Sequence, residues 1–438
     1  MAAPPRIEPE PSPVFETAVD SIARAQRRLL AQRSFAGLWW GQLCSITGDR
    51  LTYLALMGLL FERTGSGPAY AGLLAVLGNV VIAPVLLFAP FAGAWIDRRN
   101  LKSVLVIADV ARAVIVFAMP IVYGWSNDLT TVFGLVFLLF TINVFFLPAK
   151  SALIPDVVPR EQLLAANSLL AGAGIAATGI GALVGGWVVD RWGWALAMRL
   201  DALSYLVSVA GLALIAPMRH HSAAPEMQTG VASYLRDVLD GWRLLRSRAT
   251  IVVALLALAT VWWSGGVLHV AGNDHVQTAA SVPGMLRIGI LLCAIGAGTG
   301  VGTWWINRHG RDHAPSVVLG AGLTLASVAV LLFAATKLFA VFVLAAVLLG
   351  LFAAPALILT ETVLQQATSP GQRARLFSAK DFVMRATLLA SLSASAWCVA
   401  ATGPRTTLAI GAFVLLAAAI GIVRAGRRDT STVSQIEA

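Results

Sequence analysis

The stretch "FAGAWIDRRNLKSV", residues 91–104, interrupts two long apolar runs with Asp97, Arg98, Arg99 and Lys102. The chain around it has a mean hydropathy of +0.78 and 12% charged residues, whereas about 25% is usual in soluble proteins. Apolar runs of about 20 residues, the length that crosses a bilayer as a helix, recur along most of the chain. The sequence therefore predicts an all-α membrane protein in which residues 91–104 form a turn between two spans.

Twelve spans are predicted, and a polar interval at 217–249 divides them into six and six. We expect no removable signal peptide, because no lone apolar core follows a basic start. The spans lie near 35–61, 70–95, 103–124, 129–149, 165–189, 194–216, 250–272, 283–306, 315–336, 338–360, 382–402 and 406–423. The predicted units are a cytoplasmic tail and surface helix (1–34), an N-terminal six-helix bundle (35–216), a central cytoplasmic loop (217–249), a C-terminal six-helix bundle (250–423) and a cytoplasmic tail (424–438).

Basic residues gather on one side of these spans. Of the 32 Lys and Arg residues, only Arg63, Arg191, Lys337 and Arg405 fall in segments on the other side. The positive-inside rule then predicts a plasma (inner) membrane protein with both termini in the cytoplasm. The same distribution explains the net charge of +10 without a nucleic-acid partner, because the inner leaflet of the bilayer is negatively charged.

An internal repeat supports the division into halves. "WIDRRNLK" (95–102) has an echo in "WINRHGRD" (305–312), where Asn307 replaces Asp97. "FFLPAKSALIP" likewise matches "LFAAPALILTE", with Pro148 and Pro355 in corresponding positions. Repeated halves are typical of secondary transporters, whose substrate site lies between the halves near the midplane of the membrane.

Gly93, Asp97, Arg98, Arg99 and Lys102 have the spacing GxxxDR…K and resemble the motif between spans 2 and 3 of the major facilitator superfamily. Twelve spans in two pseudo-symmetric six-helix bundles match that fold, which implies transport by alternating access. Four further segments are similar to the drug:proton antiporter branch that includes macrolide and siderophore exporters: "GQLCSITGDRLTYLAL" (41–56), "IADVARAVIVF" (107–117), "FFLPAKSALIPDVVPREQLLAANSL" (145–169) and "GIGALVGGWVV" (179–189).

The charged turn can serve in two ways. Its positive charges can simply hold the loop inside. Alternatively, as the resemblance implies, Asp97 faces the positive N-terminal end of a helix of the other half, in span 11, and locks the inner gate. Arg98, Arg99 and Lys102 then serve as latch and orientation residues.

Ionisable residues inside spans cost about 2.5–3.5 kcal/mol on insertion scales, so each one suggests a function. Asp49 and Arg50 fall in the middle of span 1. Adjacent residues diverge by about 100° on a helix, so we expect one of the two to face the cavity or a neighbouring span. Asp49 is the first candidate for the carboxylate that carries the proton; the alternative is a polar residue that packs between helices.

Spans 3 and 6 carry four more candidates for proton coupling or cavity charge. Asp109 and Arg112 are three residues apart, hence on one face and able to pair; a structural ion pair is the alternative to a functional one. Arg199 and Asp201 lie on nearly opposite faces, so at least one needs a partner on another helix or a route to the membrane surface.

Proton coupling favours an Asp with a movable Arg partner, because burial and a neighbouring cation shift the pKa of a carboxylate in opposite directions. Two departures separate this chain from the antiporter pattern. Span 4 has only Thr141 and Asn143 where many proton antiporters carry an arginine. Span 5 has Ala177 and Ala182 in place of the first Gly and the Pro of GxxxGPxxGG.

Small residues predict close helix packing. Gly181, Gly185 and Gly186 in span 5, and Gly298 and Gly302 in span 8, have spacings that let helix backbones approach. Spans 5 and 8 meet across the halves in the resembling fold, so we expect these glycines to lie between the halves. Close packing without a role in motion is the alternative.

Aromatic and Met side chains predict an apolar cavity, or else contacts with lipid and other helices. The candidates are Trp262, Trp263, Phe342, Phe352 and Met57. We predict a monomer that needs no cofactor or metal and that exports amphipathic small molecules, namely drugs, secondary metabolites or siderophores, with protons as the coupling ion. Neutral, zwitterionic or anionic amphiphiles are favoured over polycations, because no acidic cluster is evident.

Other classes of protein remain as alternatives. One is a facilitator that moves lysophospholipids or other lipids, and another is a receptor or scaffold that transports nothing. An intramembrane enzyme is disfavoured, since the sequence has no HExxH, GxSxG or GxxxxGK motif. Cys44, Cys293 and Cys398 are dispersed, which excludes a CxxC metal site.

Overall fold

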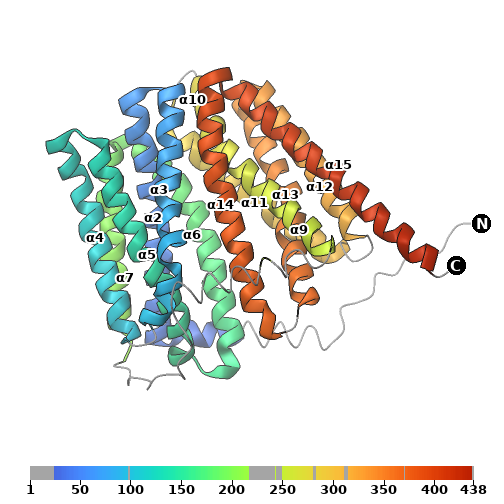
Figure 1. Cartoon of the computed structure of the whole chain (residues 1–438). Coiled ribbons are helices and arrows are strands. Elements are labelled where there is room, and N and C mark those ends of the chain that lie inside the picture. The colour runs from blue at the N-terminus through green and yellow to red at the C-terminus, as the bar shows by residue number, and fades with distance from the viewer. Residues whose placement is uncertain are drawn as a thin grey trace, which may run out of the picture.

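The computed structural model describes residues 24–96, 99–216, 242, 249–279, 283–309, 314–368 and 370–436. The regular elements within these ranges are all helices (Figure 1). They are α2 (Arg33–Thr64), α3 (Pro68–Ile96), α4 (Leu101–Ser126), α5 (Leu129–Val157), η1 (Arg160–Gln162), α6 (Leu163–Trp192), α7 (Trp194–Ala213), α9 (Ala249–Val267), η2 (Leu268–Gly272), α10 (Asn273–Ala279), α11 (Met285–His309), α12 (Pro315–Ala335), α13 (Phe339–Ala367), α14 (Pro370–Thr402) and α15 (Pro404–Ile436).

Eleven helical segments of the described chain are long and apolar enough to cross a membrane. α2 is not among them, and it carries Asp49 and Arg50 in its middle. It is nevertheless 32 residues long and packs along α6 and α7. With α2 as the first span, the predicted twelve-span fold class is confirmed, and the protein is a multi-pass membrane protein.

The two sets of six spans pack by the same pattern. In the first half, α2 packs against α6 and α7, α4 against α5 and α7, and α3 against α5. In the second half, α9 packs against α14 and α15, α12 against α13 and α15, and α11 against α13. Each contact therefore has a counterpart six spans later, which makes the two bundles pseudo-symmetric.

Two helix crossings join the halves, α6 with α11 and α3 with α14, and the same six-span shift relates them. At the first crossing a Cβ on Gly186 would lie 2.5 Å from the Met285 carbonyl oxygen and 2.6 Å from the Cα of Leu286. A Cβ on Gly289 would lie 2.1 Å from the carbonyl oxygen of Ala182. Only glycine at these two positions allows the backbones of the two halves to touch.

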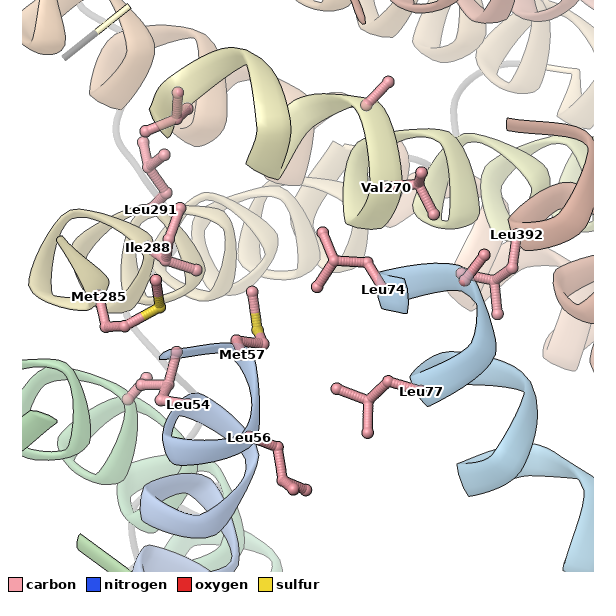
Figure 2. Packing of buried hydrophobic residues seen from close by; sticks show 14 of the residues in the cluster. Leu54, Leu56, Met57, Leu74, Leu77, Val270, Met285, Ile288, Leu291 and Leu392 are labelled. Carbon is pink, nitrogen blue, oxygen red and sulfur yellow. The ribbon is translucent and has the colours of Figure 1, made fainter. Parts of the chain in front are cut away.

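The halves share one apolar core. We call the end of the bundle at which α2 begins and α15 ends the terminus side, and the opposite end the far side. The first-half members of the shared core lie in the middle and far-side parts of their helices, for example Met57 and Leu74. Figure 2 shows these residues with Val270, Ile288 and Leu392 of the second half.

Each half has a core of its own on the terminus side. Phe35, Leu105 and Leu153 belong to a cluster of first-half residues, whereas Ile251 and Leu376 belong to a cluster of second-half residues. In the described part of the chain, apolar contact between the halves is therefore concentrated in the middle and on the far side. In this structure the two halves are thus closed against each other on the far side.

Candidate functional site

A cavity of about 570 Å³ lies between the halves, at the middle of the bundle. Its wall combines charged and polar residues of the first half with mainly apolar residues of the second. The lining residues include Asp49, Arg50, Thr52, Tyr53, Arg112, Asn143, Asp201 and Tyr205 from the first half and Trp262, His269 and Leu357 from the second.

A second cavity of about 430 Å³ lies mainly within the second half, between α9, α11, α12, α13 and α15. Arg50, Tyr53 and His269 belong to the walls of both cavities. The two spaces are thus neighbours that meet beside α2 and η2.

Two carboxylates of the first cavity accept short hydrogen bonds. The Tyr205 hydroxyl donates to Asp49 Oδ1 at 2.5 Å, and the Thr52 hydroxyl donates to Asp201 Oδ2 at 2.5 Å. The Ser204 hydroxyl donates to Asp201 Oδ1 at 3.0 Å. Asp201 is completely buried, whereas Asp49 is half-buried. Asp49 is therefore the more accessible carboxylate of the two.

Asp109 and Arg112 form a buried ion pair on one face of α4, as their spacing predicts. The Arg112 guanidinium also donates to Asn143 Oδ1 at 3.3 Å. It lies over the rings of Phe146, at 3.9 Å, and Tyr205, at 4.6 Å. The cation of span 3 is thereby held against Asn143 of span 4, the span in which the antiporter pattern places its arginine.

Asp49 and Arg50 diverge, as helix geometry predicts, yet both line the first cavity. We expected only one of them to do so; the cavity reaches both because it extends around α2. Asp49 is bonded to Tyr205 of α7, while Arg50 lies at the junction with the second cavity. Within the described residues no hydrogen bond or ion pair holds the Arg50 guanidinium, and its Nε is buried without a partner.

Three other basic residues make their contacts outside this network. Arg199 is on an exposed face of α7, opposite the buried Asp201. Arg287 lies over the Phe339 ring at 5.1 Å, near the start of α11. Lys150 donates to Gln42 Oε1 at 2.9 Å, which joins α5 to α2.

The predicted gating motif is described in part. Asp97 and Arg98 lie outside the described residues, so the predicted contact between Asp97 and span 11 stays a prediction. Gly93 makes no close packing contact with another described helix: a Cβ added at this position would have no atom within 4 Å.

Arg99 and Lys102 make contacts within the first half. Arg99 lies over the Trp95 ring at 5.2 Å. Lys102 Nζ donates to the carbonyl oxygens of Ala213, at 3.4 Å, and Ile215. These carbonyls lie at the C-terminal end of α7 and just after it. A cation is favourable there because the C-terminal end of the helix dipole is negative. Lys102 therefore joins the start of α4 to the end of α7.

Two aspartates join the halves on the far side. Asp190, at the end of α6, accepts from the N–H groups of Met285 at 2.6 Å and Leu286 at 2.9 Å, at the start of α11. Asp274 Oδ1 accepts from the N–H of Gly67 at 2.5 Å. We call Asp190 and Asp274 with these partners the far-side clasp.

His269 also connects the two halves, on the side of the far-side clasp that faces the middle of the bundle. It lies on the π-helical turn η2, with its Nδ1 3.2 Å from the Tyr53 hydroxyl and its Nε2 3.3 Å from the Leu74 carbonyl oxygen. The sequence did not single out His269, Tyr53 or Tyr205. The π-helical turn positions His269, and contacts with distant helices position Tyr53 and Tyr205. Neither feature produces a periodic pattern in the sequence.

Four of the five glycines predicted between the halves lie within a half instead. A Cβ on Gly181 would meet the Thr47 carbonyl oxygen of α2 at 2.7 Å, and one on Gly185 the Leu51 Cα at 3.1 Å. In α11, Gly298 and Gly302 face the carbonyl oxygens of Val347 and Leu351 of α13, at 2.0 and 2.4 Å from the position of a Cβ. Gly186 is the one that lies between the halves.

Among the five residues proposed for an apolar cavity, Trp262 lines the first cavity. Met57 and Phe342 are buried in the shared core, and Trp263 and Phe352 pack against it. The apolar wall comes mainly from aliphatic residues of α11, α12 and α13. No group of three or more His, Cys, Asp or Glu residues in the described ranges could hold a metal ion.

Residues 38–313 match the family model described as Major Facilitator Superfamily. The chain belongs to the major facilitator superfamily. It is 23% identical over 347 residues to the putative bacilysin exporter BacE of Bacillus subtilis (strain 168), which covers 78% of this chain and 83% of that protein. It is 24% identical to the macrolide efflux protein A of Streptococcus pyogenes over 52% of this chain and 55% of that one.

Two further comparisons concern a lipid transporter and a solved structure. A lysophospholipid transporter, LplT of Cronobacter sakazakii, is 24% identical over 66% of this chain and 71% of that protein. A solved bacterial homolog of the human lysosomal transporter Spinster, in an inward-facing and occupied conformation, superposes with a TM-score of 0.68 and 15% identity, over 90% of this chain and 97% of that one. This superfamily member therefore has relatives among exporters, and the solved structure shares its fold.

Proposed function

We propose that this protein exports amphipathic small molecules, such as drugs, secondary metabolites or siderophores, in exchange for protons. It does so as a monomer in the plasma (inner) membrane, with both termini, and hence the terminus side, in the cytoplasm. The observation that carries the proposal is the cavity between the halves, with the half-buried Asp49 bonded to Tyr205 in its wall. The exporter relatives support the direction of transport.

The polar network links protonation of Asp49 to the packing of the helices around the cavity. An ionised Asp49 accepts a hydrogen bond from the Tyr205 hydroxyl, and the ring of Tyr205 lies under the Arg112 guanidinium. Protonation of Asp49 removes a negative charge from this site, which weakens its hold on Tyr205 and leaves Asp109 as the main counter-charge of Arg112. Because these residues belong to α2, α4 and α7, a proton on Asp49 alters the contacts among three helices that surround the cavity.

Gating follows from the positions of the contacts between the halves. With the far side closed by the clasp and the shared core, substrate enters from the terminus side. Opening the far side requires Asp190 and Asp274 to release their N–H partners. Asp97 would then close the terminus side by meeting the N-terminal end of α14, whose positive dipole end favours a carboxylate.

Transport in sealed vesicles tests the proposal. Purified protein in liposomes should expel a fluorescent amphipathic drug only while a pH gradient is imposed. Asp49→Asn should abolish the gradient-driven flux and leave drug binding intact. Asp128→Asn is the matched control, since Asp128 is an exposed carboxylate at the start of α5, and it should transport normally. Flux by Asp49→Asn that still follows the gradient would exclude Asp49 as the proton carrier.

A second candidate function is translocation of lysophospholipids, which the LplT relative favours. A lipid facilitator would move a labelled lysophospholipid between leaflets without a pH gradient. The same vesicles distinguish the two functions: lipid movement at zero gradient, with no drug efflux under a gradient, would replace the exporter proposal.

A further inference from the structure

Arg50, a cation at the centre of the molecule, has no hydrogen-bond or ion-pair partner among the described residues. The other charged groups of the cavity walls are engaged: Asp49 by Tyr205, Asp201 by two hydroxyls, and Arg112 by Asp109 and Asn143. In the part of the chain that the structure describes, Arg50 is the charged residue of these cavity walls that makes neither a hydrogen bond nor an ion pair. A half-buried guanidinium without a counter-charge is costly within a membrane.

The cavity beside Arg50 is apolar. Ile288, Leu291, Leu349 and Ala353 are among the residues that line the second cavity, and its volume is about 430 Å³. Ser264 Oγ and Asn273 Oδ1 belong to residues of the same wall and are buried without hydrogen-bond partners. An apolar space with two unsatisfied polar atoms suits a mainly apolar ligand group that carries a polar substituent.

We propose that the substrate is an acidic amphiphile whose anionic group binds Arg50 at the junction of the cavities and whose apolar part fills the second cavity. This inference rests on the proposed function for the location of the site and adds the chemical class. A guanidinium offers two parallel N–H donors to a carboxylate, sulfonate or phosphate, so it fixes the orientation of the ligand as well as its charge.

The charge balance separates an acid from a cation. The two carboxylates that line the cavities, Asp49 and Asp201, already accept hydrogen bonds from the protein, whereas Arg50 has no partner among the described residues. An anion displaces nothing and supplies the counter-charge that Arg50 lacks. Binding of the acid also neutralises the junction, which favours closure of the halves around it.

A matched pair of fluorescent probes tests the role of Arg50. The first is 8-anilinonaphthalene-1-sulfonate, and the second is N-phenyl-1-naphthylamine, which has the same ring system without the sulfonate. Binding is measured to the full-length protein in nanodiscs, corrected with empty nanodiscs and with no pH gradient. Arg50→Gln should weaken binding of the sulfonate about tenfold or more and change binding of the neutral probe by less than about twofold.

Two variants control for charge and folding. Arg50→Lys keeps the charge without the planar pair of donors and should restore part of the affinity for the sulfonate. Arg287→Gln removes a cation near the start of α11 that contacts a phenylalanine ring, and it should bind both probes normally. Equal losses for the two probes in Arg50→Gln, or no loss for either, would overturn the inference.

A third variant tests where the apolar part binds. Ala353→Phe narrows the second cavity and should weaken binding of both probes; Leu349→Phe serves if the first variant does not fold. Undiminished binding of both probes in a folded variant would contradict the assignment of the second cavity.

Competition identifies the source of the acid. Displacement of the sulfonate by lysophosphatidylglycerol indicates a lipid, and displacement by dodecanoate indicates a free acid; both results support the inference. Displacement by dodecylamine alone contradicts it. Because no gradient is used, failure of antiport leaves these results untouched, and their failure leaves drug efflux under a gradient open.

Discussion

The two halves of the molecule carry different side chains at a helix contact that both of them have. In the first half, the contact between α4 and α7 contains Arg112, Asp109 and the ring of Tyr205. In the second half, the equivalent contact between α12 and α15 has, among its described residues, a buried hydrogen bond from the Ser327 hydroxyl to the carbonyl oxygen of Ala412, at 2.8 Å, and no ion pair. Helices in this position can therefore pack together without charged side chains. This is the basis for the proposal that the charges of the first half serve transport.

The largest predicted effect tests this difference between the two helix pairs directly. Arg112→Gln leaves Asp109 as a buried carboxylate without its counter-charge and should cost about 3–5 kcal/mol of unfolding free energy. Ser327→Ala removes one neutral hydrogen bond and should cost about 0.5–1.5 kcal/mol. Denaturant unfolding in detergent, followed by tryptophan fluorescence, gives both values.

The double variant Asp109→Asn with Arg112→Gln is the control for that prediction. Removing both charges should recover much of the stability lost in Arg112→Gln, because no uncompensated charge remains. If Arg112→Gln costs no more than Ser327→Ala, the two helix pairs do not differ in the way proposed.

A smaller effect is predicted for the two crossings that join the halves. Gly186→Ala places a methyl group against the backbone of Met285 and Leu286 and should cost about 1–3 kcal/mol. Gly78→Ala, at the α3 and α14 crossing, meets only the end of the Leu392 side chain, at 2.7 Å, which can rotate. Thermal unfolding of the two variants compares them; equal losses would show that the crossings are equally tight.

The difference between the halves also shows what the sequence could predict. Hydropathy and the repeat identified the spans and their division, and the spacing of Asp109 and Arg112 predicted their ion pair. The glycine spacing predicted close packing but not the partner, since Gly185 contacts α2 while its neighbour Gly186 contacts α11. Which face of a helix meets which neighbour depends on long-range packing, which a local pattern does not contain.

The far-side clasp should respond more weakly than the crossing of α6 with α11. Asp190→Ala removes a carboxylate that accepts two N–H groups at the start of α11 and should cost about 0.5–2 kcal/mol. Since this contact links the halves, the loss should fall on the far-side-closed state. Hydrogen exchange of the first turn of α11 should then be faster, while the terminus-side cores stay protected. Uniformly faster exchange throughout would instead indicate global destabilisation.

The smallest effect concerns the ends of equivalent helices. α5 begins with Asp128, which accepts from the N–H groups of Thr130 at 2.9 Å and Thr131 at 3.0 Å, whereas Leu338 begins α13 without a side-chain cap. Hydrogen bonds from the Thr130 N–H and from Thr131 lower the pKa of Asp128 to about 2. Because this pKa is lowered, the stabilisation is complete above the ordinary pKa of an aspartate and is lost only as the pH falls through about 2.

Exchange of the Thr130 and Thr131 amides, corrected for the intrinsic rate, should therefore be constant between about pH 5 and pH 8. Asp128→Ala should speed the exchange of these two amides and leave drug efflux unchanged, because the equivalent α13 begins without such a cap. A loss of transport in Asp128→Ala would mean that the start of α5 takes part in gating, and the two halves would then differ at their far-side ends as well as in their centres.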